Sequence, residues 1–235
     1  MKLLVIIPTY NEIDNITAII PQVFQNIPQD AGILVVDDGS PDGTADAVKN
    51  LRGGVWENRL HLLERTEKKG LADAYITGFK WGIEHGYDVL CEMDADFSHK
   101  PEYLPKLYEA IQTHDVAIGS RNIKGGSVEG WSMLRNCISK GGSLYSRLVL
   151  GVSVKDLTGG FNMWRKDTLD KIGLDTIISK GYSFQIEMKY KACKAGCSIK
   201  EIPIVFPDRK YGQSKMSKGI FFEALKAVWR IRKGV

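Results

Sequence analysis

Two aspartates one residue apart, Asp94 and Asp96, carry the strongest chemical signal in the sequence. They follow Asp88–Met93, an apolar run that predicts a buried strand. Carboxylates this close repel each other unless a cation lies between them, and Mg²⁺ or Mn²⁺ is a natural partner for such a pair. We therefore expect a divalent metal site that substrate phosphates complete, the alternative being a solvated turn. Ser98 is expected either to help hold the metal or a ligand oxygen, or to cap the next helix.

A second acidic pair, Asp37 and Asp38, follows the apolar run Ile33–Val36. At the carboxyl end of a parallel strand, Asp38 is placed to accept hydrogen bonds from a nucleobase or a ribose, although the pair alone is also a turn signal. The sequence contains no G-x-G-x-x-G, no G-x-x-x-x-G-K-[ST] and no G-x-S-x-G. These absences exclude the dinucleotide-binding fingerprint, the P-loop and the hydrolase nucleophile elbow.

Basic residues near Gly- or Ser-rich segments are the third signal. Arginine matches phosphate geometry with two hydrogen bonds, and lysine acts as a point charge. For any one of these residues the alternative is an ordinary surface charge, but the segment 209–215 follows a predicted strand and is rich in donors, so we expect it to close over a polyanion. The residues concerned are Arg121, Arg135, Arg209, Lys215 and Lys218.

Strand and helix patterns alternate through the first half of the chain, which predicts an α/β fold with a mostly parallel sheet flanked by helices. Ligands of such sheets bind at the carboxyl ends of the strands, where the acidic pairs lie. The predicted strands are Leu3–Pro8, Ile33–Val36, Leu60–Glu64, Asp88–Met93 and Val116–Gly119. The predicted helices are Asn11–Ile27, Thr44–Leu51, Gly70–His85 and Pro101–Thr113.

The second half of the chain is less regular. Lys124–Gly126 and Gly141-Gly142 predict turns, and Thr158–Arg165 predicts a loop that enters a strand. Further helices are predicted at Ser139–Leu150, Thr168–Ile172 and Ser183–Ala195, and a strand at Ile199–Phe206. A last amphipathic helix at about 217–232 has an apolar face and a basic face, which suits a membrane surface or a partner helix, the alternative being ordinary packing on the domain.

The composition is that of a globular protein. The chain has 235 residues, 43% of them hydrophobic and 26% charged, which excludes a disordered or fibrous chain and predicts a single domain over residues 1–235. A net charge of +4 is too small to indicate nucleic acid as a partner. The four cysteines form no C-x-x-C pair and predict reduced thiols, and no apolar run has the length of a membrane-spanning helix.

In their order along the chain, these motifs resemble the inverting GT-A glycosyltransferases of family 2, and more closely the dolichol-phosphate (polyprenol-phosphate) mannosyltransferases. The resemblance covers essentially the whole chain and implies a GT-A type, Rossmann-like fold. Its carriers are Val5–Glu12, Val35–Thr44, Lys69–Leu71, Met93–His99, Ile118–Arg121, Leu157–Phe161 and Arg209–Lys215.

The resemblance also implies roles for single residues. The nucleoside of a GDP-sugar would be held by Pro8, Tyr10, Glu12, Val36 and Asp38. The metal, Mg²⁺ or Mn²⁺, and the diphosphate would be surrounded by Asp94, Ala95, Asp96 and Ser98. The acceptor phosphate and the sugar-phosphate charge would meet Arg121 and Arg135, and a loop would clamp the donor through Arg209 and Lys215.

The implied reaction moves mannose from GDP-mannose to a dolichyl or polyprenyl phosphate with inversion at the anomeric carbon. The alternatives are a polyprenyl-phosphate glucosyltransferase that uses a UDP-sugar, and a non-catalytic subunit that binds nucleotide sugars. Some members of the family have Gln at the position of Ser98, and many continue into transmembrane helices. We expect a cytoplasmic protein that is peripheral at the cytosolic face of a membrane, through its own helix or a small membrane subunit.

Overall fold

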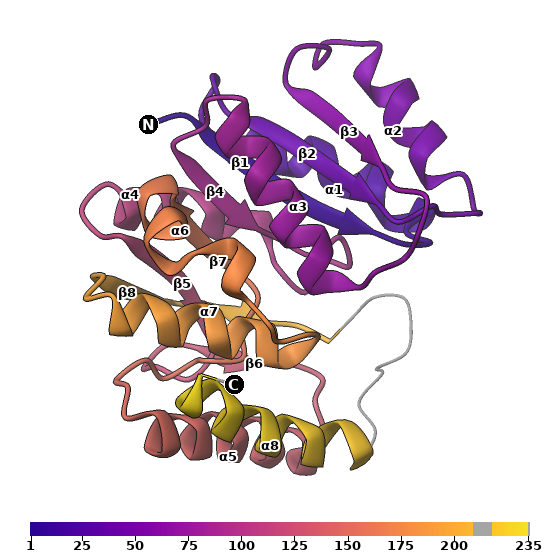
Figure 1. Ribbon diagram of the computed structural model, residues 1–235. Coiled ribbons are helices and arrows are strands. Elements are labelled where there is room, and N and C mark those ends of the chain that lie inside the picture. Colours follow the sequence, from indigo (N-terminus) through magenta and orange to yellow (C-terminus); the bar gives the residue numbers. More distant parts are fainter. Residues whose placement is uncertain (209–217, 235) are drawn as a thin grey trace.

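The computed structural model describes residues 1–208 and 218–234, without the side chains of 134, 135, 182 and 218–225. Seven strands form one sheet in the order β3-β2-β1-β4-β7-β5-β8 (Figure 1). All neighbouring strands are parallel except β7, which is antiparallel to both β4 and β5, so the predicted α/β class is confirmed. The strands are β1 (Leu3–Thr9), β2 (Gly32–Asp37), β3 (Leu60–Glu64), β4 (Val89–Glu92), β5 (Val116–Ser120), β7 (Asn162–Arg165) and β8 (Ile199–Pro203).

Helices cover both faces of this sheet, and β1 shows how the sequence produces the two layers. Its successive side chains point to opposite faces, so Val5 and Ile7 enter one core and Leu4 and Ile6 the other. Because both faces are buried, the strand is apolar throughout rather than alternating. The first core includes residues of α1 (Ile13–Gln25), α2 (Thr44–Arg52) and α4 (Leu104–Ile111), and the second includes residues of α3 (Leu71–Glu84), α6 (Lys166–Ile172) and α7 (Tyr182–Lys194).

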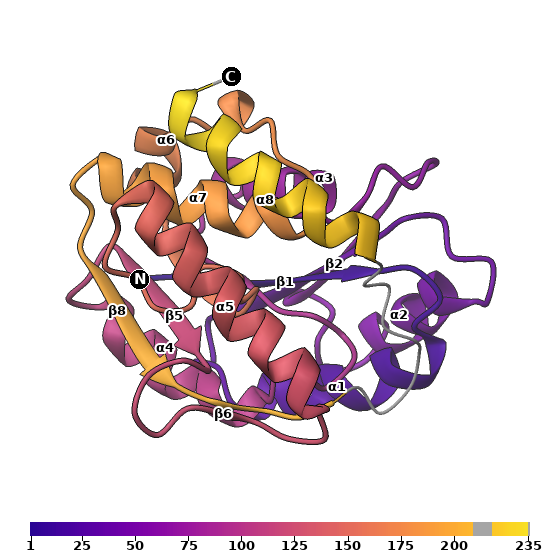
Figure 2. The same cartoon turned by 90° about the horizontal axis from the view of Figure 1, so that it is seen from below.

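Two further helices, α5 (Met133–Leu150) and α8 (Lys218–Lys233), lie side by side beyond α7 (Figures 1 and 2). α8 packs against both α5 and α7, and Val228 and Ile231 on its inner side are buried. The C-terminal helix predicted at about 217–232 is confirmed, although residue 217 lies outside the described part of the chain. Among the described helices, none combines the length and the hydropathy needed to cross a bilayer.

Two predictions in the second half are wrong. Gly141 and Gly142 lie inside α5, which begins at Met133 rather than Ser139. Packing against α8 outweighs the helix-weakening effect of the glycines, about 1 kcal/mol each. The strand predicted at Ile199–Phe206 is two strands, because β8 ends at Pro203, which has no N–H to donate, and β9 (Val205–Phe206) pairs instead with β6 (Ser127–Val128).

Candidate functional site

The carboxyl ends of β2, β1 and β4 meet at one edge of the sheet, as the sequence predicts. β1 pairs with β2 on one side and β4 on the other, all parallel. The segments that leave these strands are therefore neighbours at that edge: Pro8–Glu12, Asp37-Asp38 and Asp94–Ser98. The backbone continues the ladder for one residue, since the N–H of Asp38 donates to the carbonyl oxygen of Thr9 at 3.0 Å.

The loop after β4 holds both aspartates in fixed positions. Tyr75, fully buried on α3, donates its hydroxyl to Oδ1 of Asp94 at 2.9 Å. Burial raises the pKa of this phenol well above its usual value, so it remains a donor. Oδ1 of Asp96 accepts hydrogen bonds from the backbone N–H of Ser98 at 3.1 Å and from its hydroxyl at 2.5 Å.

Two further features fix the shape of this loop. Phe97 has a φ of 62°, a left-handed conformation that is uncommon for a bulky residue. Nδ1 of His99 accepts the backbone N–H of Asp94 at 2.9 Å, and its ring stacks on Phe161 with centroids 4.9 Å apart. The conformation is thus determined by surrounding contacts, as is typical of functional loops.

The donor set fits a small hard cation with few protein ligands. The described residues contain no group of three or more His, Cys, Asp and Glu side chains that would hold a metal by themselves. Asp94 and Asp96 offer carboxylate oxygens, and Mg²⁺ and Mn²⁺ are bound in this way when phosphates and water complete the shell. The hydroxyl of Ser98 donates to Asp96, so its role as a metal ligand remains a prediction.

At the β2 end of this edge, where the nucleoside is predicted to bind, Asp38 is already paired. Arg65, the first residue after β3, contacts Oδ1 of Asp38 through Nη2 at 2.5 Å and also pairs with Asp73 of α3. Nζ of Lys68 lies 3.3 Å from the ring centre of the half-exposed Tyr10. A nucleobase that reaches Asp38 and Tyr10 therefore also meets Arg65 and Lys68.

The other residues predicted for this side have different surroundings. Oε2 of Glu12 accepts a hydrogen bond from Asn15 at 2.8 Å. Val36 and Ala95 are buried, and Pro8 is partly buried. Pro8, Val36 and Ala95 therefore shape the edge largely through their backbone.

Arg121 follows β5, which lies two strands beyond β4 in the order of the sheet, and its side chain also lies near this edge. Its Nε and Nη2 each donate to a carboxylate oxygen of Asp156 at 2.8 Å. Its Cζ lies 5.1 Å from the ring centre of Phe206, whose ring is also 5.6 Å from that of His99. Phe206 therefore bridges Arg121 and the loop that carries Asp94 and Asp96. The side chain of Arg135, and Arg209 and Lys215 entirely, lie outside the described residues.

A network of buried charges supports this arrangement. Nζ of Lys189 donates to the carbonyl oxygens of Asp156 at 2.9 Å and Gly159 at 2.6 Å. Burial lowers the pKa of Lys189 to about 8, against the attraction of Asp156 and Glu92. Glu92, the last residue of β4, accepts hydrogen bonds from Asn162, Trp164 and Gln185 at 2.7, 2.9 and 2.7 Å.

Several of these residues were missed in the sequence. Arg65 follows a strand directly, which is the same signal that indicated Asp38. Lys189 lies on the apolar face of its helix, between Ile186 and Ala192, and a charge there indicates a buried partner. Tyr75 gives no such signal, since an aromatic residue on an apolar helix face is ordinary core.

Comparison with known proteins identifies the family of the chain. Residues 4–173 match the family described as glycosyl transferase family 2. An undecaprenyl-phosphate mannosyltransferase of Micrococcus luteus is 48% identical over 230 residues, covering 98% of this chain and 93% of that protein. A polyprenol monophosphomannose synthase of Mycolicibacterium smegmatis is 47% identical over 234 residues, covering 98% and 88%.

Two solved structures share the fold. Glucosyl-3-phosphoglycerate synthase from Mycobacterium tuberculosis, in complex with Mn²⁺, UDP and glucosyl-3-phosphoglycerate, has a TM-score of 0.68 at 16% identity, covering 100% of this chain and 80% of that chain. The mannosyltransferase PcManGT from Pyrobaculum calidifontis, in complex with GDP-Man and Mn²⁺, has a TM-score of 0.63 at 18% identity, covering 98% and 69%. The predicted GT-A fold is thus confirmed, and with the family match along most of its length the chain belongs to glycosyltransferase family 2.

Proposed function

We propose that this enzyme transfers mannose from GDP-mannose to a polyprenyl phosphate and inverts the anomeric carbon. The observation that carries the proposal is the bridge made by Phe206, which holds a cationic arginine beside a loop with two carboxylates. Such a site suits a reaction between two anionic partners. The names and the near-complete coverage of the two bacterial relatives support the sugar and the acceptor class.

The donor would lie along the carboxyl edge of β1, β2 and β4. Tyr10, Glu12 and Asp38 would bind the nucleoside, with Pro8 and Val36 shaping its surroundings. Asp94, Ala95, Asp96 and Ser98 would surround the diphosphate and the divalent cation. When bound there, Mg²⁺ or Mn²⁺ supplies Lewis-acid stabilisation to the leaving diphosphate. We further assign Arg209 and Lys215 to the donor.

The acceptor would be met by Arg121 together with Arg135. A phosphate oxygen of the acceptor is already anionic at neutral pH, so the reaction needs no strong general base. The main tasks of the protein are then alignment and charge stabilisation. Arg121 is suited to alignment because Asp156 fixes its guanidinium through two hydrogen bonds. An in-line attack converts an α-linked donor into a β-linked product.

The acceptor's lipid chain requires the enzyme to work at a membrane. We propose that it is a peripheral protein at the cytosolic face. It would be held there by the two helices α5 and α8, which are rich in Lys and Arg, or by a small membrane subunit. The basic residues of α8 and the half-exposed Trp229 support this assignment.

The experiment that tests the function is a donor panel. GDP-mannose, GDP-glucose, UDP-glucose and UDP-mannose would each be offered with a polyprenyl phosphate and Mn²⁺. Turnover with GDP-mannose alone is the expected result, and turnover with UDP-glucose alone would reject mannose. Asp96→Asn should abolish transfer while the far-UV circular dichroism spectrum stays unchanged. Inactivity with every donor would favour a non-catalytic subunit.

A further inference from the structure

A basic hollow of about 320 Å³ lies next to the arginine side of the site, between the segment after β5 and one side of α5. Four cationic side chains line it, and none of the described lining residues is a carboxylate; the nearby carboxylates are those of Asp156, which pairs with Arg121, and Glu201, which accepts the backbone N–H of Lys155 at 2.9 Å. Asn122 helps to close it, since its Nδ2 lies 3.4 Å from the hydroxyl oxygen of Ser143 and 3.3 Å from the carbonyl oxygen of Lys155. The polar lining residues are Arg121, Asn122, Lys140, Ser143, Arg147 and Lys155.

The charges of this hollow are poorly balanced by the protein. Asp156 offsets Arg121, but within the described part of the chain Lys140, Arg147 and Lys155 form no ion pair. Nε of Arg147 is buried and meets no acceptor among the described groups. Like charges held together without a counter-charge repel one another, and a bound anion relieves that repulsion.

The side of the same helix that borders the hollow also exposes apolar side chains, and Leu144 itself lines the hollow. Leu144 and Leu148 lie four residues apart on α5 and are 52% and 73% exposed. Met133 at the start of the helix is 85% exposed. Exposed leucines beside unpaired cations are the pattern of a helix that lies in a membrane interface, with apolar tips among the acyl chains and cations at the headgroups.

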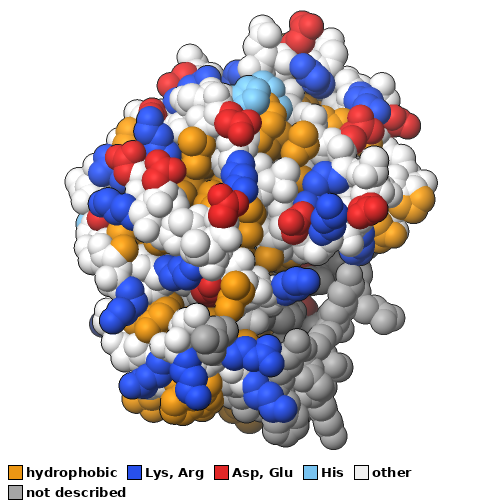
Figure 3. All heavy atoms as spheres, viewed as in Figure 1, with side chains coloured by type: hydrophobic (Ala, Val, Ile, Leu, Met, Phe, Trp, Pro, Cys, Tyr) orange, Lys and Arg blue, Asp and Glu red, His pale blue; other side chains and the backbone are white. Residues whose placement is uncertain are grey.

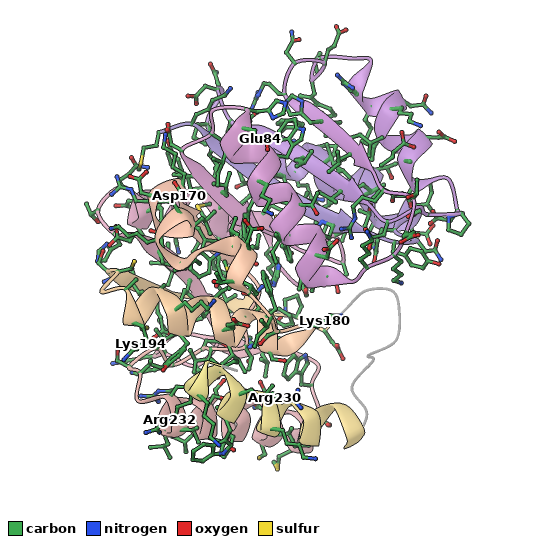
Figure 4. The ribbon with its side chains drawn as sticks, viewed as in Figure 1. Glu84, Asp170, Lys180, Lys194, Arg230 and Arg232 are labelled. Atoms are coloured by element: carbon green, nitrogen blue, oxygen red, sulfur yellow. The ribbon has the colours of Figure 1, made fainter. Side chains whose placement is uncertain are left out.

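The positive charge of the protein is concentrated in this layer. The sequence of α5 contains three Lys and Arg residues and that of α8 contains five, and the two helices together contain one glutamate. Their summed charge is therefore +7, while the whole chain carries +4. Blue and orange spheres accordingly gather over α5 and α8 at the lower end of the molecule in Figure 3. Arg230 and Arg232 of α8 lie at that end in Figure 4.

We propose that the hollow binds the phosphate of an anionic phospholipid headgroup and that α5 thereby docks the enzyme on the membrane. Lys140, Arg147 and Lys155 would contact the phosphate, and Leu144 and Leu148 would enter the acyl layer. The inference rests on the proposed function only in that the acceptor is a membrane lipid. It adds a second phosphate site beside the one for the acceptor, and the side chain of Arg121 borders both.

Vesicle sedimentation at low salt tests the headgroup site. The wild type should bind vesicles of phosphatidylglycerol and phosphatidylcholine and leave pure phosphatidylcholine vesicles in solution. The double variant Lys140→Gln/Arg147→Gln should lower the partition coefficient about tenfold. The control Arg52→Gln/Lys106→Gln removes two charges from α2 and α4, on the opposite face of the sheet, and should bind as the wild type does. Equal binding by wild type and double variant would overturn the proposal.

Kinetics with two forms of the acceptor separate this site from the acceptor's own. The double variant should raise KM for a vesicle-borne polyprenyl phosphate at least fivefold more than KM for a short-chain acceptor in solution. An equal rise in both would assign the hollow to the acceptor phosphate and overturn the headgroup site. A wild type that binds anionic vesicles but transfers no sugar would reject the proposed function while supporting the headgroup site.

Discussion

Arg121 and Asp156 form a buried ion pair in which both ends are fixed. The guanidinium makes two parallel hydrogen bonds of 2.8 Å to the carboxylate, and the backbone N–H of Arg121 adds a third at 2.9 Å. Burial alone would raise the pKa of Asp156, but the charge and hydrogen bonds of Arg121 outweigh it and hold the pKa well below its usual range. Asp156 therefore stays ionised and keeps Arg121 in one orientation.

Asp156→Asn should strongly destabilise the fold. Removing one partner leaves a buried guanidinium unpaired, which lowers the free energy of unfolding by about 3–5 kcal/mol. Because the pKa of Asp156 is lowered on folding, its contribution is present above pH 4 and is lost in more acidic solution, so the difference from wild type should shrink there. Urea denaturation across this range measures both effects. Asp175→Asn, which breaks the exposed pair with Lys80, is the control and should change little; similar losses in both variants would contradict the prediction.

Glu92 should give the protein an unusual dependence on pH. Burial raises its pKa from 4.5 to about 7, although hydrogen bonds from Trp164, Asn162 and Gln185 oppose the shift. The folded state therefore holds this proton up to a higher pH than the unfolded state does, so the stability due to Glu92 is fully present below pH 4.5 and is lost as the pH rises through 7. Glu92→Gln removes the titration. The free energy of unfolding of wild type minus that of the variant should fall between pH 4.5 and 7, and a constant difference would disprove this assignment.

Tyr75 should matter for metal binding although it lies behind the site. Its hydroxyl donates a hydrogen bond to Asp94 and so positions that carboxylate. Loss of a group that orients a metal ligand commonly lowers the affinity for the metal by about tenfold or more. We expect Tyr75→Phe to reduce Mn²⁺-dependent GDP binding by about that factor, as measured by calorimetry with and without EDTA. Tyr108→Phe removes a hydroxyl that bonds to Met1 and should leave GDP binding unchanged. Unaltered binding in Tyr75→Phe would show that Asp94 needs no such support.

The parts that the sequence predicted are those that depend on local pattern. Continuous apolar runs identified β1, β2 and β4, and their parallel pairing then determined that Asp38 and Asp94 lie at one edge. The ion pair of Arg121 with Asp156 joins residues 35 positions apart, and the hydrogen bond of Lys189 to Asp156 spans 33. Composition and periodicity contain no information about such pairings. The full length of α5 was missed for a related reason, since the helix as a whole packs against α8, a distant segment.

The same substitution at two helical glycines should have different effects on stability. A Cβ on Gly82 of α3 would lie 2.6 Å from Cδ1 of Leu90 and 2.8 Å from Cδ2 of Leu4. Gly82→Ala should therefore overpack the contact between α3 and the sheet, which lowers the free energy of unfolding by about 1–3 kcal/mol. This loss cancels or exceeds the gain in helix propensity of about 1 kcal/mol.

Gly141 of α5 has no atom within 4 Å of the same added Cβ. Gly141→Ala should keep the full gain and raise the free energy of unfolding by about 1 kcal/mol. Urea denaturation of the two variants and the wild type measures both changes in the free energy of unfolding. A stabilised Gly82→Ala would mean that Leu4 and Leu90 move aside at no cost, and that α3 is not held against the sheet by the close approach at this glycine.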